Sequence, residues 1–100
     1  MTVLVIAREQ AALDRVLPLL RRGGIDAAST TSDDEAIRQL EAGGVDAVVI
    51  GSGVQEPSRQ QLRSVANRKG IRVIDGALRG KDPEVYVRDE LLPALQRAIK

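Results

Sequence analysis

Short apolar runs alternate with longer amphipathic stretches along this chain. The apolar runs cover residues 3–6, 25–29, 47–50 and 71–74, and the third run (AVVI) leads directly into Gly-Ser-Gly. A short, β-branched apolar run that is bounded by glycines predicts a strand buried on both faces. We therefore expect residues 47–50 to form a central strand, and residues 25–29 to form the weakest of the four.

The stretches between these runs have apolar residues at helical spacing. Each has one stripe at intervals of three or four residues: Leu13, Val16, Leu17 and Leu20, then Ala36, Ile37 and Leu40, then Leu62, Val65 and Ala66. This spacing predicts three amphipathic helices, each of which ends at a glycine. Ser32 and Glu35 predict a capping box at the start of the second helix. Pro18 is expected either to bend the first helix or to confine its regular part to residues beyond Asp14.

This alternation predicts an α/β fold. Strands that alternate with helices of about ten to fifteen residues are joined by right-handed crossovers and form a parallel sheet. A chain of 100 residues is long enough for one hydrophobic core and too short for two. No linker or low-complexity segment interrupts it, so we expect residues 1–100 to form a single domain.

The regular alternation ends after the fourth strand. Residues 76–83 contain two glycines and a proline and are expected to form a loop. Two predictions then compete: a helix that begins at Pro83, or a short strand over 84–88 that is followed by a helix capped by Asp89. We favour the strand, because this segment is rich in β-formers and a helix from Pro83 would place Pro93 deep in its interior.

The composition excludes several classes of function. The chain has 15 Lys+Arg against 14 Asp+Glu, a net charge of +1, and a single aromatic residue. We therefore expect no nucleic-acid binding and no attraction to a membrane. Because the chain has no cysteine and no histidine, we expect no disulfide and no zinc site, although a weak magnesium site is not excluded. No motif in the sequence indicates a cofactor, and we expect none. The apolar runs are too short for a signal peptide or a membrane span, which favours a cytoplasmic protein.

Five segments, taken in order, resemble one known family. They are Val3–Glu9, Thr31–Leu40, Asp46–Gly51, Tyr86–Asp89 and Leu91–Leu95. These segments resemble the first strand, the second helix, the strand that ends in the phospho-accepting aspartate, the last strand and the last helix of response-regulator receiver (CheY-like) domains. The resemblance covers nearly the whole chain. It implies a flavodoxin-like, three-layer sandwich with a parallel sheet in the order 2-1-3-4-5.

The chain departs from this family at the positions of its phosphoryl-transfer chemistry. The magnesium-binding acidic pair falls on Ala7 and Arg8, the phospho-acceptor on Gly51, the hydroxyl position on Ala77, and the lysine position on Asp89 or Arg88. Phosphoryl transfer to a carboxylate needs the carboxylate itself, a metal and a cation beside the product. The segment before the last strand is also about a helix shorter than in the family. The resemblance therefore implies a degenerate pseudo-receiver whose fourth helix is shortened or missing.

The candidate ligand-binding residues lie where the first and third strands end: Arg8, Gly51, Ser52 and Gly53. In the implied sheet order, the crevice that binds ligands opens at this point. An arginine and the backbone N–H groups of a glycine turn would suit an anion or a nucleotide. The alternative is that Arg8 fills the space of the missing metal and pairs with Glu9 or Asp75. No histidine or neighbouring lysine could activate Ser52, so we assign no catalytic residue and do not expect an enzyme.

A second candidate surface follows from the missing fourth helix. Without that helix the face formed by residues 71–88 is poorly covered, and an exposed apolar face or strand edge attracts a protein partner or a second copy of the chain. The candidate interface residues are Leu78, Val85, Tyr86 and Val87. The alternative for Tyr86 is a half-buried position on an edge strand.

Two functions follow from these two sites. The first is a phosphorylation-independent pseudo-receiver that acts as a protein–protein interaction module in bacterial signalling, through a partner protein or as a homodimer. The alternative is a small-molecule-binding domain that holds an anion or a nucleotide in the crevice.

Overall fold

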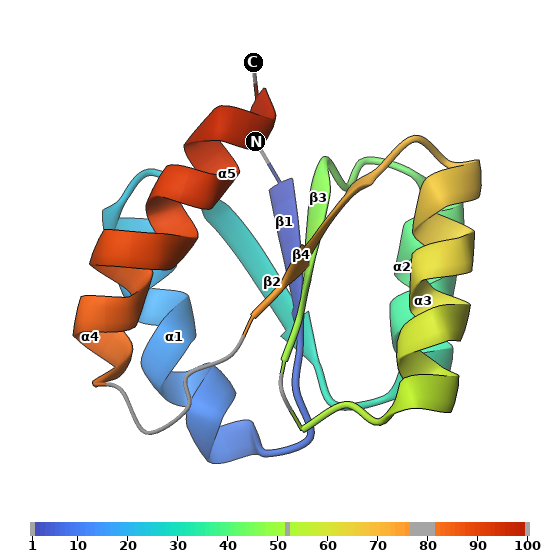
Figure 1. The fold of residues 1–100 in the computed structure, drawn as a ribbon, viewed down its shortest axis with the longest axis horizontal. Coiled ribbons are helices and arrows are strands. Elements are labelled where there is room, and N and C mark those ends of the chain that lie inside the picture. The colour runs from blue at the N-terminus through green and yellow to red at the C-terminus, as the bar shows by residue number, and fades with distance from the viewer. Residues whose placement is uncertain (1, 52, 77–81, 100) are drawn as a thin grey trace.

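Four parallel strands form the central sheet (Figure 1). A computed structural model describes residues 2–51, 53–76 and 82–99, and at 83, 84, 98 and 99 it describes the backbone alone. The strands are β1 (Thr2–Ile6), β2 (Asp26–Thr30), β3 (Ala47–Ile50) and β4 (Arg72–Asp75), and they lie in the order β2-β1-β3-β4. In the register of the sheet, Val3 lies between Ala27 and Ala47. The predicted parallel sheet and the position of its first four strands are confirmed.

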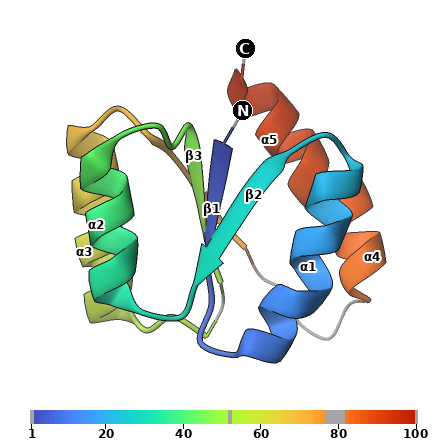
Figure 2. The same cartoon turned by 180° about the vertical axis from the view of Figure 1, so that it is seen from behind.

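Helices cover both faces of the sheet and make the fold a three-layer sandwich (Figures 1 and 2). The helix α1 (Gln10–Arg22) and the C-terminal helical segment lie on one face, and α2 (Asp33–Ala42) and α3 (Glu56–Arg68) lie on the other. Side chains of β3 alternate between two cores: Ala47 and Val49 pack toward α1, and Val48 and Ile50 pack toward α2 and α3. All four are buried, as predicted for a strand covered on both faces.

The starts and ends of the first three helices follow the local sequence. The Ser32 hydroxyl accepts a hydrogen bond from the Glu35 N–H at 3.3 Å, which is the predicted cap of α2. Gly70, which follows α3, has a φ of 71°, a left-handed conformation that favours glycine. The helix α1 begins at Gln10 and contains Pro18, so the expectation that its regular part begins beyond Asp14 is wrong.

The C-terminal segment is helical throughout, and the predicted strand over 84–88 is wrong. An α-helical turn, α4 (Pro83–Tyr86), leads into a π-helical turn, η1 (Val87–Leu91), and then into α5 (Leu92–Ile99). The alternative prediction of a helix start at Pro83 is confirmed. The described residues therefore contain no fifth strand, and the described part of the sheet ends at β4. Residues 77–81, which fall in the predicted loop, lie outside the described residues.

The π-helical turn gives a physical reason why this helix tolerates Pro93. The N–H of Leu92 bonds to the carbonyl of Val87, five residues earlier, and this wider turn comes directly before the proline. We interpret the wider turn as relieving the clash between the proline ring and the carbonyl four residues earlier. The same spacing brings Tyr86 and Leu91, both buried, to one side of the helix.

The described part of the chain has no helix with the length and apolar character needed to cross a membrane.

Candidate functional site

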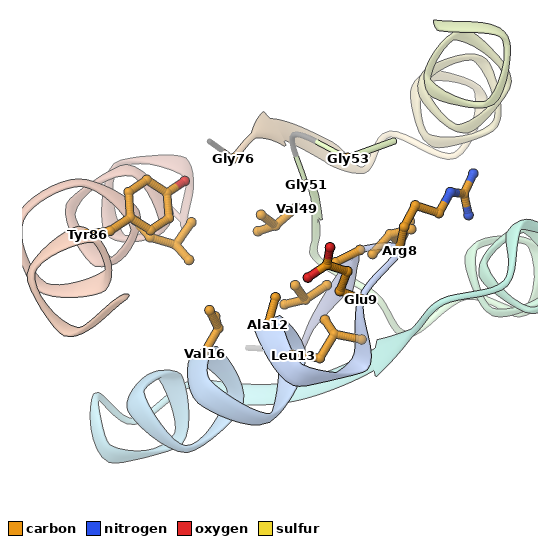
Figure 3. Close-up of a pocket in the computed structure, with 14 residues that line it drawn as sticks. Arg8, Glu9, Ala12, Leu13, Val16, Val49, Gly51, Gly53, Gly76 and Tyr86 are labelled. Atoms are coloured by element: carbon orange, nitrogen blue, oxygen red, sulfur yellow. The ribbon is translucent and has the colours of Figure 1, made fainter. Parts of the chain in front are cut away.

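A cavity of about 400 Å³ lies at the carboxyl ends of β1 and β3 (Figure 3). Its walls come from the end of β1, the first half of α1, the segment after β3, Gly76 and the C-terminal helical segment. β1 lies between β2 and β3, so the connections that leave β1 and β3 run to opposite faces of the sheet. Open α/β sheets bind ligands at such a point. The cavity is therefore at the position that the sequence analysis predicted for a ligand crevice.

The walls of the cavity are mainly apolar. Val16 and Leu13 of α1 face Val49 of β3 (Figure 3). Tyr86 and Leu91 line the cavity from the C-terminal helical segment. Small-molecule sites are typically lined in this way, with a few polar groups that orient the ligand. The position of the cavity was predicted, but its apolar walls were not.

Two glycines allow close packing around this cavity. A Cβ atom on Gly51 would lie 3.0 Å from the carbonyl oxygen of Ile6, and one on Gly76 would lie 3.0 Å from both the Tyr86 hydroxyl and Val49 Cγ1. Any larger residue would force its neighbours to shift. Gly51 and Gly76, which follow β3 and β4, therefore allow the end of β1 and the Tyr86 side chain to pack closely against the ends of these strands.

The structure brings three of the four candidate ligand-binding residues together. Arg8, Gly51 and Gly53 all line the cavity, and the Cβ position of Gly53 is 3.7 Å from Arg8 Cβ. Ser52 lies outside the described residues.

The guanidinium group of Arg8 points away from the cavity (Figure 3). Its Nη2 lies 2.8 Å from Asp33 Oδ1, and its Nη1 donates a hydrogen bond of 3.0 Å to the carbonyl of Thr31. The expected pairing of Arg8 with Glu9 or Asp75 is therefore wrong. The physical reason is that the connection between β2 and α2 passes beside the end of β1. It brings the Asp33 carboxylate and the Thr31 carbonyl within reach of the Arg8 side chain.

Asp33 connects this arginine to α3. Its Oδ2 accepts a hydrogen bond of 2.5 Å from the Ser58 hydroxyl, while the contact of its buried Oδ1 with Arg8 is an ion pair without an aligned hydrogen bond. Burial opposes ionisation of Asp33, but the contacts with Ser58 and Arg8 together outweigh it and lower its pKa. Asp33 is thus an ionised partner of Arg8 at neutral pH, a role beyond the favourable interaction of its charge with the helix dipole.

Arg59 of α3 contacts the residues that end β3 and β4, and sequence analysis did not identify it. Its side chain is 13% exposed and bonds to Asp75 Oδ1 at 2.7 Å, the Gly51 carbonyl at 2.6 Å and the Val54 carbonyl at 3.3 Å. Arg63 also pairs with Asp75. The hydrogen bond from Arg63 lowers the pKa of Asp75, and the hydrogen bond from Arg59 lowers it further. Burial of Asp75 acts in the opposite direction but is outweighed.

Glu9 carries the carboxylate nearest to the cavity. It follows β1, stands at the N-terminus of α1, and directs its carboxylate toward the cavity (Figure 3). Within the described ranges, no hydrogen bond or ion pair joins this carboxylate to another residue. Arg8 and Glu9 are neighbours in sequence, but only the Glu9 side chain can interact with a ligand without first breaking an ion pair, because Arg8 is paired with Asp33.

The candidate interface residues are mostly buried where the structure describes them. Tyr86 is 7% exposed and Val87 is 2% exposed, and both pack against α1 and the sheet. The helical conformation, in place of the predicted strand, turns these two adjacent side chains toward the core. Val85 is 39% exposed, and Leu78 lies outside the described residues.

The described residues contain no group of three or more acidic, histidine or cysteine side chains that could hold a metal ion. Binding through apolar contact and a few polar groups is the chemistry that the described walls provide.

No family model and no curated protein matches this chain. Among solved structures, the chain is similar to the solution NMR structure of a de novo designed Rossmann 2x3 fold protein, with a TM-score of 0.73 and 16% sequence identity. The alignment covers 96% of this chain and 90% of the designed protein. The chain therefore has a Rossmann-like, parallel α/β fold.

Proposed function

We propose that this protein is a small-molecule-binding domain that holds its ligand in the cavity at the carboxyl ends of β1 and β3. The observation that supports the proposal is the cavity itself, with a volume of about 400 Å³. Ligand pockets typically have volumes of roughly 300–1,000 Å³. The cavity also lies where this class of sheet binds ligands.

The lining of the cavity supports the same function. An apolar body would contact Leu13, Val16, Val49 and Leu91, and the polar groups around it come from Glu9 and the Tyr86 side chain. A pocket with apolar walls and a few polar groups gives affinity by burial and orientation by hydrogen bonds.

Two neighbouring alanines of α1 offer a matched test of this site. Ala12 lines the cavity, whereas Ala11 is exposed to solvent on the same helix. Ala12→Phe should fill the cavity with its ring, and Ala11→Phe should add the same ring outside it. The probe is indole, titrated to millimolar concentration into ¹⁵N-labelled protein and followed by amide chemical shifts and by the thermal unfolding midpoint.

We expect indole to shift the amide signals of Val16, Val49 and Gly76 and to raise the unfolding midpoint, because a ligand that binds only the folded state stabilises it. Ala12→Phe should abolish both effects, and Ala11→Phe should retain them. A folded Ala12→Phe variant that still binds indole at these amides would contradict the proposed site. The same holds for a wild-type protein whose cavity amides do not respond.

The phosphorylation-independent pseudo-receiver remains a second candidate function, and one observation favours it. Gly51 stands where the family resemblance places the phospho-acceptor, and a Cβ atom there would lie only 3.0 Å from the carbonyl oxygen of Ile6, so its neighbours would have to shift. The end of β3 is thus packed around a residue without a side chain. Such a module would act through a protein partner or as a homodimer, with the exposed Val85 on its contact surface.

A further inference from the structure

We infer that the cavity discriminates by charge and binds ligands whose polar end is a cationic amine in preference to anions with the same apolar body. This inference rests on the proposed binding function and extends it to the class of ligand. It also reverses the expectation, drawn from the sequence, that Arg8 makes this an anion site.

The first argument is that Arg8 is not available to an anion. Two of its guanidinium nitrogens are engaged, Nη2 with Asp33 at 2.8 Å and Nη1 with the Thr31 carbonyl at 3.0 Å. The group points away from the cavity, and Asp33 offsets its charge. An anion that recruited Arg8 would have to break an ion pair whose acidic oxygen is shielded from water.

The second argument is that Glu9 leaves one negative charge beside the cavity. Its carboxylate faces the cavity and has no ion pair or hydrogen bond to any other described residue. Glu9 is the N-cap residue of α1, and the first turn contains no other acid, so the positive end of the helix dipole, equivalent to about half an elementary charge, offsets only part of the negative charge of Glu9. An ammonium group at this place would gain a charge-assisted hydrogen bond, and a carboxylate or phosphate would be repelled.

The third argument is the arrangement of apolar and polar walls. Leu13, Val16, Val49 and Leu91 line the cavity with apolar side chains, while Glu9 lies just after the end of β1. A ligand with a flat apolar body and an amine at one end can therefore bury its body and keep its charge beside the carboxylate. The geometry suits this class better than a nucleotide, whose phosphates would face Glu9.

Three probes with the same ring separate these possibilities: tryptamine, tryptophol and indole-3-acetate, which carry a cation, a neutral hydroxyl and an anion. Dissociation constants are measured at pH 7 and low salt from the shifts of the Val49 and Gly76 amides. We expect tryptamine to bind at least about tenfold more tightly than indole-3-acetate, with tryptophol between them.

The matched variants are Glu9→Gln and Glu56→Gln. Glu56 also lies in the first turn of a helix, α3, but does not line the cavity. We expect Glu9→Gln to reduce the preference for tryptamine over indole-3-acetate to within about threefold, because it removes the unpaired charge that Glu9 contributes to the described lining of the cavity. Glu56→Gln should leave this preference unchanged. Because the Glu9 carboxylate has no partner among the described residues, its replacement should not impair folding, which the amide spectrum checks directly.

The outcomes separate this inference from the proposed function. Probes that bind at the cavity amides without a charge preference, or with a preference for indole-3-acetate, would overturn the inference and leave the binding site standing. A preference that survives Glu9→Gln would overturn it as well. If none of the three probes moves the cavity amides, the proposed function fails, and the inference fails with it.

Discussion

Arg59 joins α3 to the ends of two strands beside the pocket. Its guanidinium donates to the Gly51 and Val54 carbonyls and to the carboxylate of Asp75, and only 13% of the side chain is exposed. A planar group with five N–H donors can reach three acceptors at once, whereas a lysine ammonium cannot span them. This residue therefore fixes the backbone at Gly51, which forms one wall of the cavity.

We expect Arg59→Lys to lower the free energy of unfolding by about 2 kcal/mol, because it leaves partly buried acceptors without their charge-assisted bonds. Arg63→Lys is the matched control, since Arg63 lies one helical turn away and pairs with the same Asp75 but is more exposed. Urea unfolding of both variants is the measurement. Equal midpoints for the two variants would show that the bridge to Gly51 and Val54 contributes nothing.

The position of single residues could be predicted better than their partners. Arg8 was placed at the cavity because the strand pattern locates the end of β1 to within a residue. Its partner Asp33 was not found, because the reach of a long side chain depends on how α2 approaches the sheet. Arg59 did have a sequence signal: it lies three residues before Leu62 and seven before Ala66, on the apolar stripe of α3. An arginine on an inward-facing stripe should be expected to have buried partners.

The C-terminal segment shows how two valid patterns in one element can conflict. Val85-Tyr86-Val87 has strand propensity, and Pro93 argues against a long helix, yet Pro83 follows a good N-terminal signal. The helix is the observed structure because it buries Tyr86, Val87 and Leu91 against α1 and the sheet. Strand propensity mainly reflects how well a side chain packs against its neighbours. Here these side chains pack in a helix against α1 and the sheet. The π-helical turn that reconciles Pro93 with the helix could not be read from the sequence pattern.

The two helical prolines should therefore differ in their effect on stability. Pro18 is exposed within an α-helix, where it removes one hydrogen bond and crowds the carbonyl of Asp14. We expect Pro18→Ala to raise the free energy of unfolding by about 2 kcal/mol, after allowing for the greater freedom that alanine gives the unfolded chain. Pro93→Ala should bring little gain, because η1 already accommodates the ring. Chemical unfolding of the two variants tests this contrast, and a larger gain from Pro93→Ala would refute our account of the π-helical turn.

At the scale of the whole molecule, the alternation of strands and helices determines where a pocket can form. Periodicity alone predicted three strand–helix units and a parallel sheet, and the crevice position followed from the strand order of the resemblance. The character of the pocket could not be predicted in this way, because its walls come from segments as distant as Val5 and Leu91. The apolar lining is completed only when the C-terminal helical segment, which supplies Tyr86 and Leu91, packs beside α1. The predicted strand over 84–88 had placed Tyr86 on an edge of the sheet instead.

The same arrangement leads to a prediction for the intact chain. A receiver domain accepts a phosphoryl group on a strand-end carboxylate with help from a metal and a cation. Here Gly51 offers no side chain at that position, and Arg8 is paired with Asp33. We therefore expect incubation with acetyl phosphate and magnesium to leave the intact mass unchanged, while a receiver domain that retains its aspartate gains one phosphoryl group under the same conditions. A stable phosphoryl adduct on this chain would refute the pseudo-receiver candidate, because that candidate treats the end of β3 as a site without an acceptor.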